Sequence, residues 1–370
     1  MAARYILPTL AFAGAVLAQC SGDLTISSSS DAATLQNCQT YKGDITISDE
    51  AAGTIALNGV QAINGDLTVN NATQLTAITS DQLNAISGSF TLTGLTILST
   101  LQFDSLSAVN KINWVGLPAL QSLNFAQGVS KANSIVISNT QLNTLTGIEL
   151  SANVTNALSF SANGRNLEIS FPNLQAAANL TFRNVSSISL PSLSSVEGDL
   201  GFFSDTFESF AAPNLTATGG SLSFVDSPNL ANLSFPELKT IGGGFVIANN
   251  SDLKSIIGFP KLATIVGALQ LTGDFDAVSL PKLGDVRGGS TVSTTSTNET
   301  ICDLFDAAAS NGVIKGVNKC DTSKAETSSS GSSSGSSASE TSSGAANPSV
   351  FNPSAPMTGA WAILAALLFI

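Results

Sequence analysis

Acidic residues are the side chains of this sequence that could do chemistry. Two local groups stand out, Asp199 with Asp205 and Glu208, and Asp274 with Asp276. Two carboxylates at a defined separation can hydrolyse a glycosidic bond, one as the acid and the other as the base or nucleophile. A polysaccharide-active enzyme is therefore one hypothesis for this chain.

The sequence around these acids favours structural roles instead. Asp199 follows a glycine just before an apolar triplet, as Asp44 and Asp66 do, which favours a role in a turn. Asp274 and Asp276 follow another apolar triplet and fall in a loop, where carboxylates are usually solvated. A calcium site built from these acids is not supported by any loop motif. The enzyme is thus the least favoured of the functions considered.

Composition removes most other chemistries. The chain has no histidine, so Ser-His-Asp and Cys-His catalysis and a His-ligated metal are ruled out. Its net charge is −12, with 14 Lys and Arg against 26 Asp and Glu, and an acidic surface disfavours nucleic acid. We predict no catalytic residue, no cofactor, no metal and no nucleic-acid partner.

Four cysteines bracket the central part of the chain. Cys20 and Cys38 are 18 residues apart, and so are Cys302 and Cys320. An even number of cysteines in an exported protein suggests disulfides. Pairing within each local pair is the simplest of the three possible connectivities, and each bridge would contribute on the order of 3 kcal/mol.

Asn-X-Ser/Thr sequons predict N-glycosylation on an exported chain. The eight sequons are at Asn71, Asn153, Asn179, Asn184, Asn214, Asn232, Asn249 and Asn298. A glycan must project into solvent, so these positions are expected on the outside of the fold.

The elements that would position all these residues belong to an internal repeat. Triplets of the type apolar–polar–apolar recur every 20 to 24 residues, from Ile45-Thr46-Ile47 to Leu269-Gln270-Leu271. Alternation of this kind indicates a strand with one buried face. A glycine often precedes the triplet, as Gly43 and Gly65 do, and we attribute it to a tight corner.

A second element follows at about half a period and ends in proline. Examples are 167–174, 188–193, 233–238, 257–262 and 278–283, each with Phe-Pro or Leu-Pro before a leucine. Proline cannot donate to a strand ladder, so it should end this strand and turn the chain.

One repeat cannot bury its own apolar face, and stacking about 4.8 Å apart would bury a continuous core. The predicted fold is all-β, a right-handed parallel β-helix of about 11–12 coils with disulfide-linked caps. The third triplet position should form an internal stack of Trp114, Ile137, Phe160, Phe182, Phe202, Phe224, Ile247 and Leu271. Residues 302–309 should form a short helix that covers the last coil.

The N-terminus has the features of a secretory signal peptide. Arg4 supplies the charge, Tyr5–Leu17 the apolar region, and Ala18 a small residue for cleavage. The C-terminus ends in the apolar run 359–370, shorter than the roughly 20 residues that span a bilayer.

Small residues and a polar spacer precede that tail, as in a signal for a glycosylphosphatidylinositol (GPI) anchor. We place the anchor on Gly344, with Ser343 and Asn347 as alternatives. The predicted organisation is a signal peptide (1–18), a β-solenoid ectodomain with caps (19–321), a Ser/Thr-rich stalk (322–344) and a GPI-signal propeptide (345–370). The stalk lacks the apolar residues needed to fold.

The ordered combination of these features resembles a known family. The coil pattern is similar to the receptor L domain, a β-helix related to leucine-rich repeats. The signal peptide, end cysteines, Gly-Asp strands, Phe-Pro and Leu-Pro repeats, stalk and GPI tail together resemble the fungal GPI-anchored cell-wall organisation proteins. The resemblance covers nearly the whole chain, although no single motif is specific.

The resemblance implies a non-enzymatic glycoprotein that contributes to fungal cell-wall organisation and integrity. It implies a place at the outer leaflet of the plasma membrane or in the wall. The implied partners are membrane lipid through the anchor and wall polysaccharide, since some members become covalently linked to glucan. The alternative is a surface receptor or adhesin that binds a protein or glycan on a sheet face; such a role has only an analogy behind it.

Overall fold

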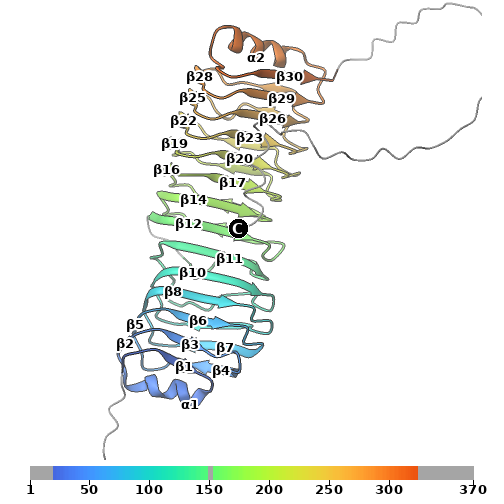
Figure 1. Ribbon diagram of the computed structural model, residues 1–370. Coiled ribbons are helices and arrows are strands. Elements are labelled where there is room, and N and C mark those ends of the chain that lie inside the picture. Colours follow the sequence, from blue (N-terminus) through green and yellow to red (C-terminus); the bar gives the residue numbers. More distant parts are fainter. Residues whose placement is uncertain (1–19, 149–152, 324–370) are drawn as a thin grey trace, which may run out of the picture. The chain divides into compact units, whose positions relative to one another are not determined.

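The computed structural model describes residues 20–148 and 153–323, which form a β-solenoid (Figure 1). The predicted signal peptide, most of the predicted stalk and the GPI signal lie outside these described residues. Parallel strands stack coil upon coil between a helix near each end, α1 (Ser29–Ala32) and α2 (Thr300–Ser310).

One column of parallel strands runs through every coil. Its members, in order, are β1 (Leu24–Ile26), β3 (Ile45–Ile47), β6 (Leu67–Asn70), β8 (Ala85–Thr93), β10 (Ala108–Leu117), β11 (Ser134–Thr140), β12 (Asn153–Ser161), β14 (Ala176–Arg183), β17 (Leu200–Phe203), β20 (Leu222–Val225), β23 (Phe245–Ala248), β26 (Leu269–Gly273), β29 (Ser290–Thr294) and β30 (Asn318–Thr322). Each pairs in parallel with the next. All the predicted triplets lie in this column, whereas β1, β29 and β30 were not expected.

Shorter strands extend the same sheet at the corner before the column. They are β2 (Thr40–Lys42) and β5 (Ala62–Asn64) in the early coils, and β16 (Ser195–Val196), β19 (Ala217–Thr218), β22 (Thr240–Ile241), β25 (Thr264–Ile265) and β28 (Asp285–Val286) in the later ones. They stack in parallel as the column does.

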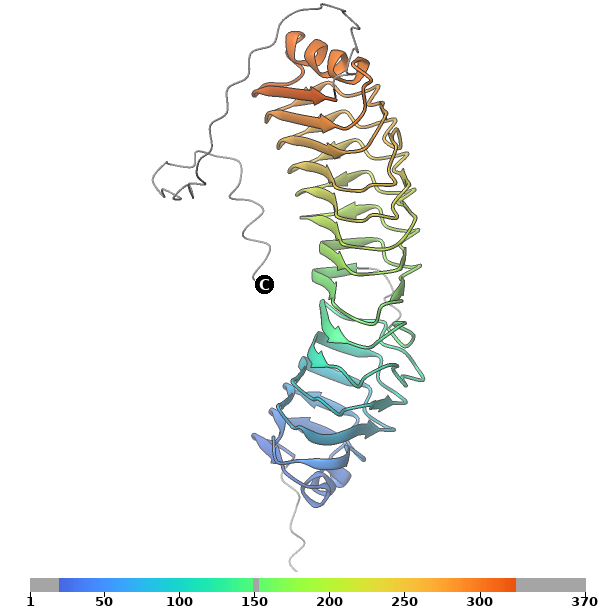
Figure 2. The same cartoon turned by 90° about the vertical axis from the view of Figure 1, so that its right-hand side faces the viewer.

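The opposite side of each coil differs along the chain, and Figure 2 shows the strand column on one side and these elements on the other. The early coils form a three-stranded sheet of β4 (Ala52–Ala56), β7 (Gln74–Ser80) and β9 (Thr100–Phe103). Later coils have only pairs: β13 (Glu168–Ser170) with β15 (Ser187–Ser189), β18 (Ser209–Ala211) with β21 (Asn232–Ser234), and β24 (Ser255–Ile256) with β27 (Ala277–Val278). Proline follows these short strands, as predicted.

The third triplet position forms the predicted internal stack. The register pairs Trp114 with Ile137 and continues coil by coil to Leu271. All eight side chains are buried. Phe182, Phe202 and Phe224 lie nearly parallel, with ring centroids 5.3 and 4.6 Å apart and interplanar angles of 17° and 5°.

Gly43 has a positive φ of 144°, which fits the predicted tight corner, but two later glycines before the strands have a different reason. Gly65 and Gly88 do not adopt positive φ, so the corner itself would accept other residues. A Cβ at Gly65 would instead overlap the carbonyl oxygen of Gly43 in the preceding coil, and one at Gly88 would overlap the carbonyl oxygen of Gly65. These glycines are needed because adjacent coils approach closely.

Both ends of the solenoid carry a disulfide and a helix. The bridges are Cys20–Cys38 and Cys302–Cys320, the local connectivity. Helix α2 covers the predicted span and buries Ile301 and Phe305. The helix α1 was not predicted, although Ser28 and Asp31 form a capping box at its start. The predicted β-solenoid of parallel coils with disulfide-linked caps is confirmed, at about 12 turns, and the likeness to receptor L domains stays a resemblance.

Candidate functional site

Asp199 lies at a coil corner and links two coils. Its Oδ1 accepts a hydrogen bond of 2.6 Å from the backbone N–H of Ser221 in the next coil. Asp44 and Asp66 do the same in the early coils, accepting from Asp66 and Ser89 at 2.8 and 2.7 Å. The carboxylate therefore satisfies a backbone donor that the corner leaves free, which supports the predicted structural role.

Asp205 lies inside the solenoid with 0% of its surface exposed. Its Oδ1 accepts a hydrogen bond of 2.8 Å from the backbone N–H of Val185, but Oδ2 has no partner among the described residues. Burial raises the pKa of this carboxyl to about 7, against the opposing effects of hydrogen bonds from Val185 and Phe203 and of the Arg183 charge. No substrate can reach a group so placed.

Asparagines show what the position of Asp205 requires. Asn163 and Asn250 stand at the same place, three residues after the third triplet residue, and are buried. Their Nδ2 atoms each donate a 3.0 Å hydrogen bond to a carbonyl of the previous coil, that of Ile137 and of Phe224. A carboxylate cannot donate, so Oδ2 of Asp205 is left without a partner. Sequence reasoning missed this internal polar column, although its spacing from the triplets was visible.

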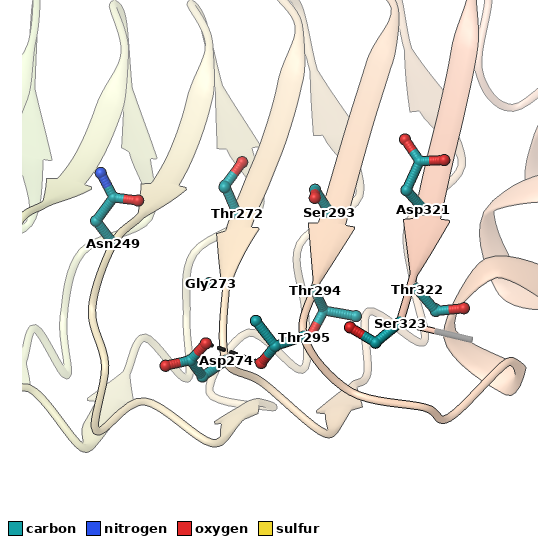
Figure 3. A pocket seen from close by; sticks show the side chains of 10 residues that line it. All are labelled: Asn249, Thr272, Gly273, Asp274, Ser293, Thr294, Thr295, Asp321, Thr322 and Ser323. Carbon is teal, nitrogen blue, oxygen red and sulfur yellow. Dashed lines mark hydrogen bonds between the residues drawn. The ribbon is translucent and has the colours of Figure 1, made fainter. Parts of the chain in front are cut away.

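The other acidic candidates are dispersed. Glu208 and Asp276 are exposed on separate coils. Asp274 borders an open hollow of about 420 Å³ (Figure 3), where its Oδ1 accepts a 2.8 Å hydrogen bond from Thr295 Oγ1. The hollow is otherwise lined by hydroxyl groups and amides, together with Asp321.

Asp274 and Asp321 are the two carboxylates of this hollow, and they are poorly placed to act together. Asp274 follows β26 and Asp321 lies in β30, with β29 between them. Two strand spacings separate the backbones by about 10 Å, and in Figure 3 the two side chains point away from each other. The carboxyl groups of glycosidases are about 5–9.5 Å apart. Among the described residues no cluster of three or more His, Cys, Asp or Glu could hold a metal ion.

The sequons face solvent, as glycosylation requires. Exposed side chains are found at Asn71, Asn179, Asn184, Asn214, Asn232, Asn249 and Asn298. The side chain of Asn153 lies outside the described residues. Occupancy of the eight sites stays a prediction.

Three of these asparagines share one backbone position. Asn71, Asn184 and Asn249 have φ of 56°, 59° and 57° and stand at the corner directly after a column strand. Other coils have glycine, alanine, serine or aspartate there in the same left-handed conformation. Asparagine tolerates this conformation better than most residues, so the repeat itself favours a glycosylation site at this corner.

The middle row of the outward face of the strand column is polar and nearly uncharged, although Lys111, Arg183 and Asp321 lie elsewhere on that face. The register aligns the middle triplet residues Thr25, Thr46, Thr68, Thr91, Asn113, Val136, Ser159, Thr181, Gly201, Ser223, Val246, Gln270, Thr291 and Lys319. Lys319, in the last coil, is the single charged side chain of this row. Such a face suits neutral polar partners better than charged ones.

The predicted anchor residues Gly344, Ser343 and Asn347 and the predicted cleavage site at Ala18 lie outside the described residues. Within the ranges 20–148 and 153–323, no helix has the length and apolar character needed to cross a membrane.

Known fungal proteins are similar to this chain over most of its length. The profile of a family described as Ecm33, GPI-anchored cell wall organization protein, matches residues 1–36. A "Protein ecm33" of Aspergillus fumigatus is 41% identical over 346 residues, covering 87% of this chain and 86% of the relative. A "Cell surface GPI-anchored protein" of Arthroderma benhamiae is 39% identical, covering 86% and 87% of the two chains.

A more distant relative is the "Cell wall protein ecm33" of Schizosaccharomyces pombe, 32% identical and covering 79% of this chain and 76% of its own. No solved structure matches the chain.

Proposed function

We propose a function on the premise that this chain belongs to the ecm33 family of fungal cell-wall proteins. The protein is a GPI-anchored glycoprotein of the fungal cell surface and wall, and it contributes to the organisation and integrity of the wall. The observation that carries this proposal is the alignment with family members over about nine-tenths of both chains.

The protein acts without catalysis in this proposal. Of the acids that could have formed a catalytic pair, Asp199 accepts a backbone hydrogen bond at a corner and Asp205 is buried. Asp274 accepts a hydrogen bond from Thr295, and the exposed Glu208 and Asp276 lie on separate coils. What the fold provides is a continuous ladder of hydrogen-bonded strands with sequons on its surface. A solenoid of this kind is suited to spacing and displaying wall components.

The proposed organisation follows the four predicted segments. A signal peptide (1–18) directs export, the solenoid (19–321) is the folded ectodomain, the Ser/Thr-rich stalk (322–344) spaces it from the membrane, and the propeptide (345–370) is exchanged for a GPI anchor on Gly344. The partners are membrane lipid through the anchor and wall polysaccharide, with covalent transfer of the anchor remnant to glucan.

The experiment is release of the protein from intact fungal cells. Phosphatidylinositol-specific phospholipase C should free the membrane-bound fraction, and glucanase should free the fraction linked to the wall. A variant with Ser343, Gly344 and Asn347 changed to bulky residues should appear in the medium without either enzyme. Retention of the native protein after both treatments would contradict the proposed anchor.

A receptor or adhesin is a second candidate because the early coils offer a surface with few sequons. Asn71 is the single sequon before residue 153, and the outward row from Thr25 to Asn113 is uncharged. Binding of the secreted ectodomain to wall polysaccharide, weakened by Thr46→Lys and Thr68→Lys but not by Thr291→Lys, would favour this function. Equal binding by all three variants would exclude this face of the early coils as the polysaccharide-binding surface.

A further inference from the structure

Phe203 differs from the other aromatic side chains of the described residues. Every other Phe, Tyr and Trp in ranges 20–148 and 153–323 is buried, whereas Phe203 is partly exposed on the outward face of β17. Its neighbour Phe202 points inward and belongs to the internal stack. Phe203 is thus the one aromatic side chain of the described residues on an outward face that otherwise carries polar, aliphatic and a few charged residues.

The neighbouring residues hold this ring on the sheet. A Cβ at Gly201 would lie 2.6 Å from Cε2 of Phe203, so the ring covers the space that a side chain at 201 would take. Arg183 pairs with Phe203 in register, and its guanidinium carbon lies 4.9 Å from the ring centroid. The result is a platform with an apolar ring and a hydrogen-bond donor beside it.

A sequon lies next to this platform. Asn184 directly follows Arg183, and its backbone N–H donates to the carbonyl of Phe203 at 3.2 Å. The Asn184 side chain is exposed and makes no hydrogen bond with the described residues. By contrast, Nδ2 of Asn214 and of Asn249 each donates to another coil. The amide of Asn184 is therefore free to carry a substituent beside the ring.

We propose that Asn184 carries an N-glycan whose first N-acetylglucosamine packs against Phe203 and Arg183. This inference rests on the proposed export of the chain, because glycosylation occurs on that route. The apolar C–H face of the sugar would cover the ring, and the guanidinium would donate to a hydroxyl or to the acetamide oxygen. In the transfer, an activated glycosyl diphosphate gives the sugar C1 to Nδ2, the diphosphate leaves, and Nδ2 loses one proton.

Asn71 offers a natural control within the same molecule. It has the same left-handed backbone, and its N–H donates to the carbonyl of Thr93 at 2.8 Å, as Asn184 does to Phe203. Thr93 has no ring, so a glycan on Asn71 lacks the platform. The two glycans should therefore differ in how tightly they lie on the protein.

The test is the rate at which a peptide-N-glycosidase releases each glycan from the native, secreted chain, followed site by site by mass spectrometry. We expect release at Asn184 to be about fivefold slower than at Asn71, the ratio for a contact of about 1 kcal/mol. Phe203→Ser should remove the difference without changing release at Asn71. Arg183→Ser keeps the Phe203 ring and should remove part of the difference between the two release rates.

Four outcomes would overturn the inference. Equal rates at the two sites, or slow release that persists in both variants, would show that the platform does not hold the glycan. An unmodified Asn184 beside occupied sequons elsewhere would also refute it while leaving the proposed function intact. A chain with no occupied sequon would refute both, because the exported glycoprotein itself would be in doubt.

Discussion

The coils before residue 149 and those after residue 152 share one strand column but close their interiors differently. In the early coils Phe90 and Trp114 meet edge to face at 84°. In the later coils Phe182, Phe202 and Phe224 stack almost in parallel. Phe90 stands at the first triplet position and Trp114 at the third, whereas the three stacked phenylalanines all stand at the third position.

The difference in ring packing follows from the strands on the side of the coil opposite the column. A continuous sheet of β4, β7 and β9 closes the early coils, with strands of up to seven residues. Short strands of two or three residues that end before proline close the later ones. The triplet repeat therefore determines the strand column. The strands on the opposite side of the coil determine which side chains fill the interior of the solenoid.

The surfaces differ as well. Seven of the eight sequons lie after residue 152, and Asn71 alone lies before it. The later coils thus carry most of the predicted glycosylation sites, and the early coils have fewer. Variants made separately in the two regions can test whether these differences affect stability.

Removing a ring from the parallel stack should have the largest effect. Phe202→Ala should cost about 3–5 kcal/mol in the free energy of unfolding, because it leaves a cavity between two rings. Val69→Ala, at the equivalent position of an early coil, removes fewer atoms and should cost less. Urea denaturation followed by circular dichroism gives both values. Equal losses of unfolding free energy in the two variants would mean that the parallel ring stack adds no stability of its own.

Loss of either cap disulfide should cost up to about 3 kcal/mol. Because each coil contacts mainly its neighbours, the damage should stay near the altered end. In the double variant of Cys20 and Cys38 to serine, hydrogen exchange should accelerate in β1 and β3 but not in β29. The matched variant of Cys302 and Cys320 should give the reverse. Acceleration throughout the chain would contradict local coupling.

Asp205 should make the stability of the later coils depend on pH. Burial raises its folded pKa to about 7, above the ordinary value of 3.8 for an aspartate, so the folded state binds the proton more tightly than the unfolded state. Stability should therefore be highest below about pH 4 and fall as the pH rises through 7. Asp205→Asn should abolish this dependence and stabilise the protein at pH 8 by on the order of 2 kcal/mol.

A reciprocal variant controls for other ionisable groups. Asn250→Asp places a carboxyl at the equivalent buried position and should introduce a fall in stability over the same pH range. Thermal unfolding from pH 4 to 8 measures both variants. An unchanged pH profile in Asp205→Asn would show that this carboxyl is not the source.

Loss of a hydrogen bond that a corner aspartate accepts from the next coil should have the smallest effect on stability. This effect should be equal in the two regions. Asp66→Ala and Asp199→Ala each remove the acceptor of one backbone N–H in the next coil. Each should cost about 1 kcal/mol, since Asp199 is exposed and Asp66 partly exposed, so that water can replace the acceptor. A difference of more than about 1 kcal/mol between the two in urea denaturation would mean that the column is not equivalent in the two regions.

The column, its register and its internal stack could be predicted because the triplet alternation repeats with little change. The caps were partly visible: the cysteine spacing and the run 302–309 indicated them, whereas α1 contains only four residues and has no apolar period. The strand β30 carries Lys319, Cys320 and Asp321, and this polar composition hid it from a search for apolar triplets.

The candidate site was harder to predict because its features depend on contacts between coils. Nothing in the local sequence of Asp205 shows that it is buried; only comparison with Asn163 and Asn250 at the same repeat position does. The reason for Gly65 was also misjudged, since the carbonyl that excludes a side chain belongs to the coil before. The platform at Phe203 depends likewise on Arg183 of the neighbouring strand and on Gly201 of its own strand.

The most direct test of the central claim is complementation of a fungal strain that lacks this gene, with growth measured on a wall-binding dye. The account predicts that the full chain restores dye tolerance and that a chain ending at residue 344, secreted without an anchor, does not. Full rescue by the unanchored chain, or no change in dye tolerance when the gene is lost, would contradict an anchored role in wall organisation.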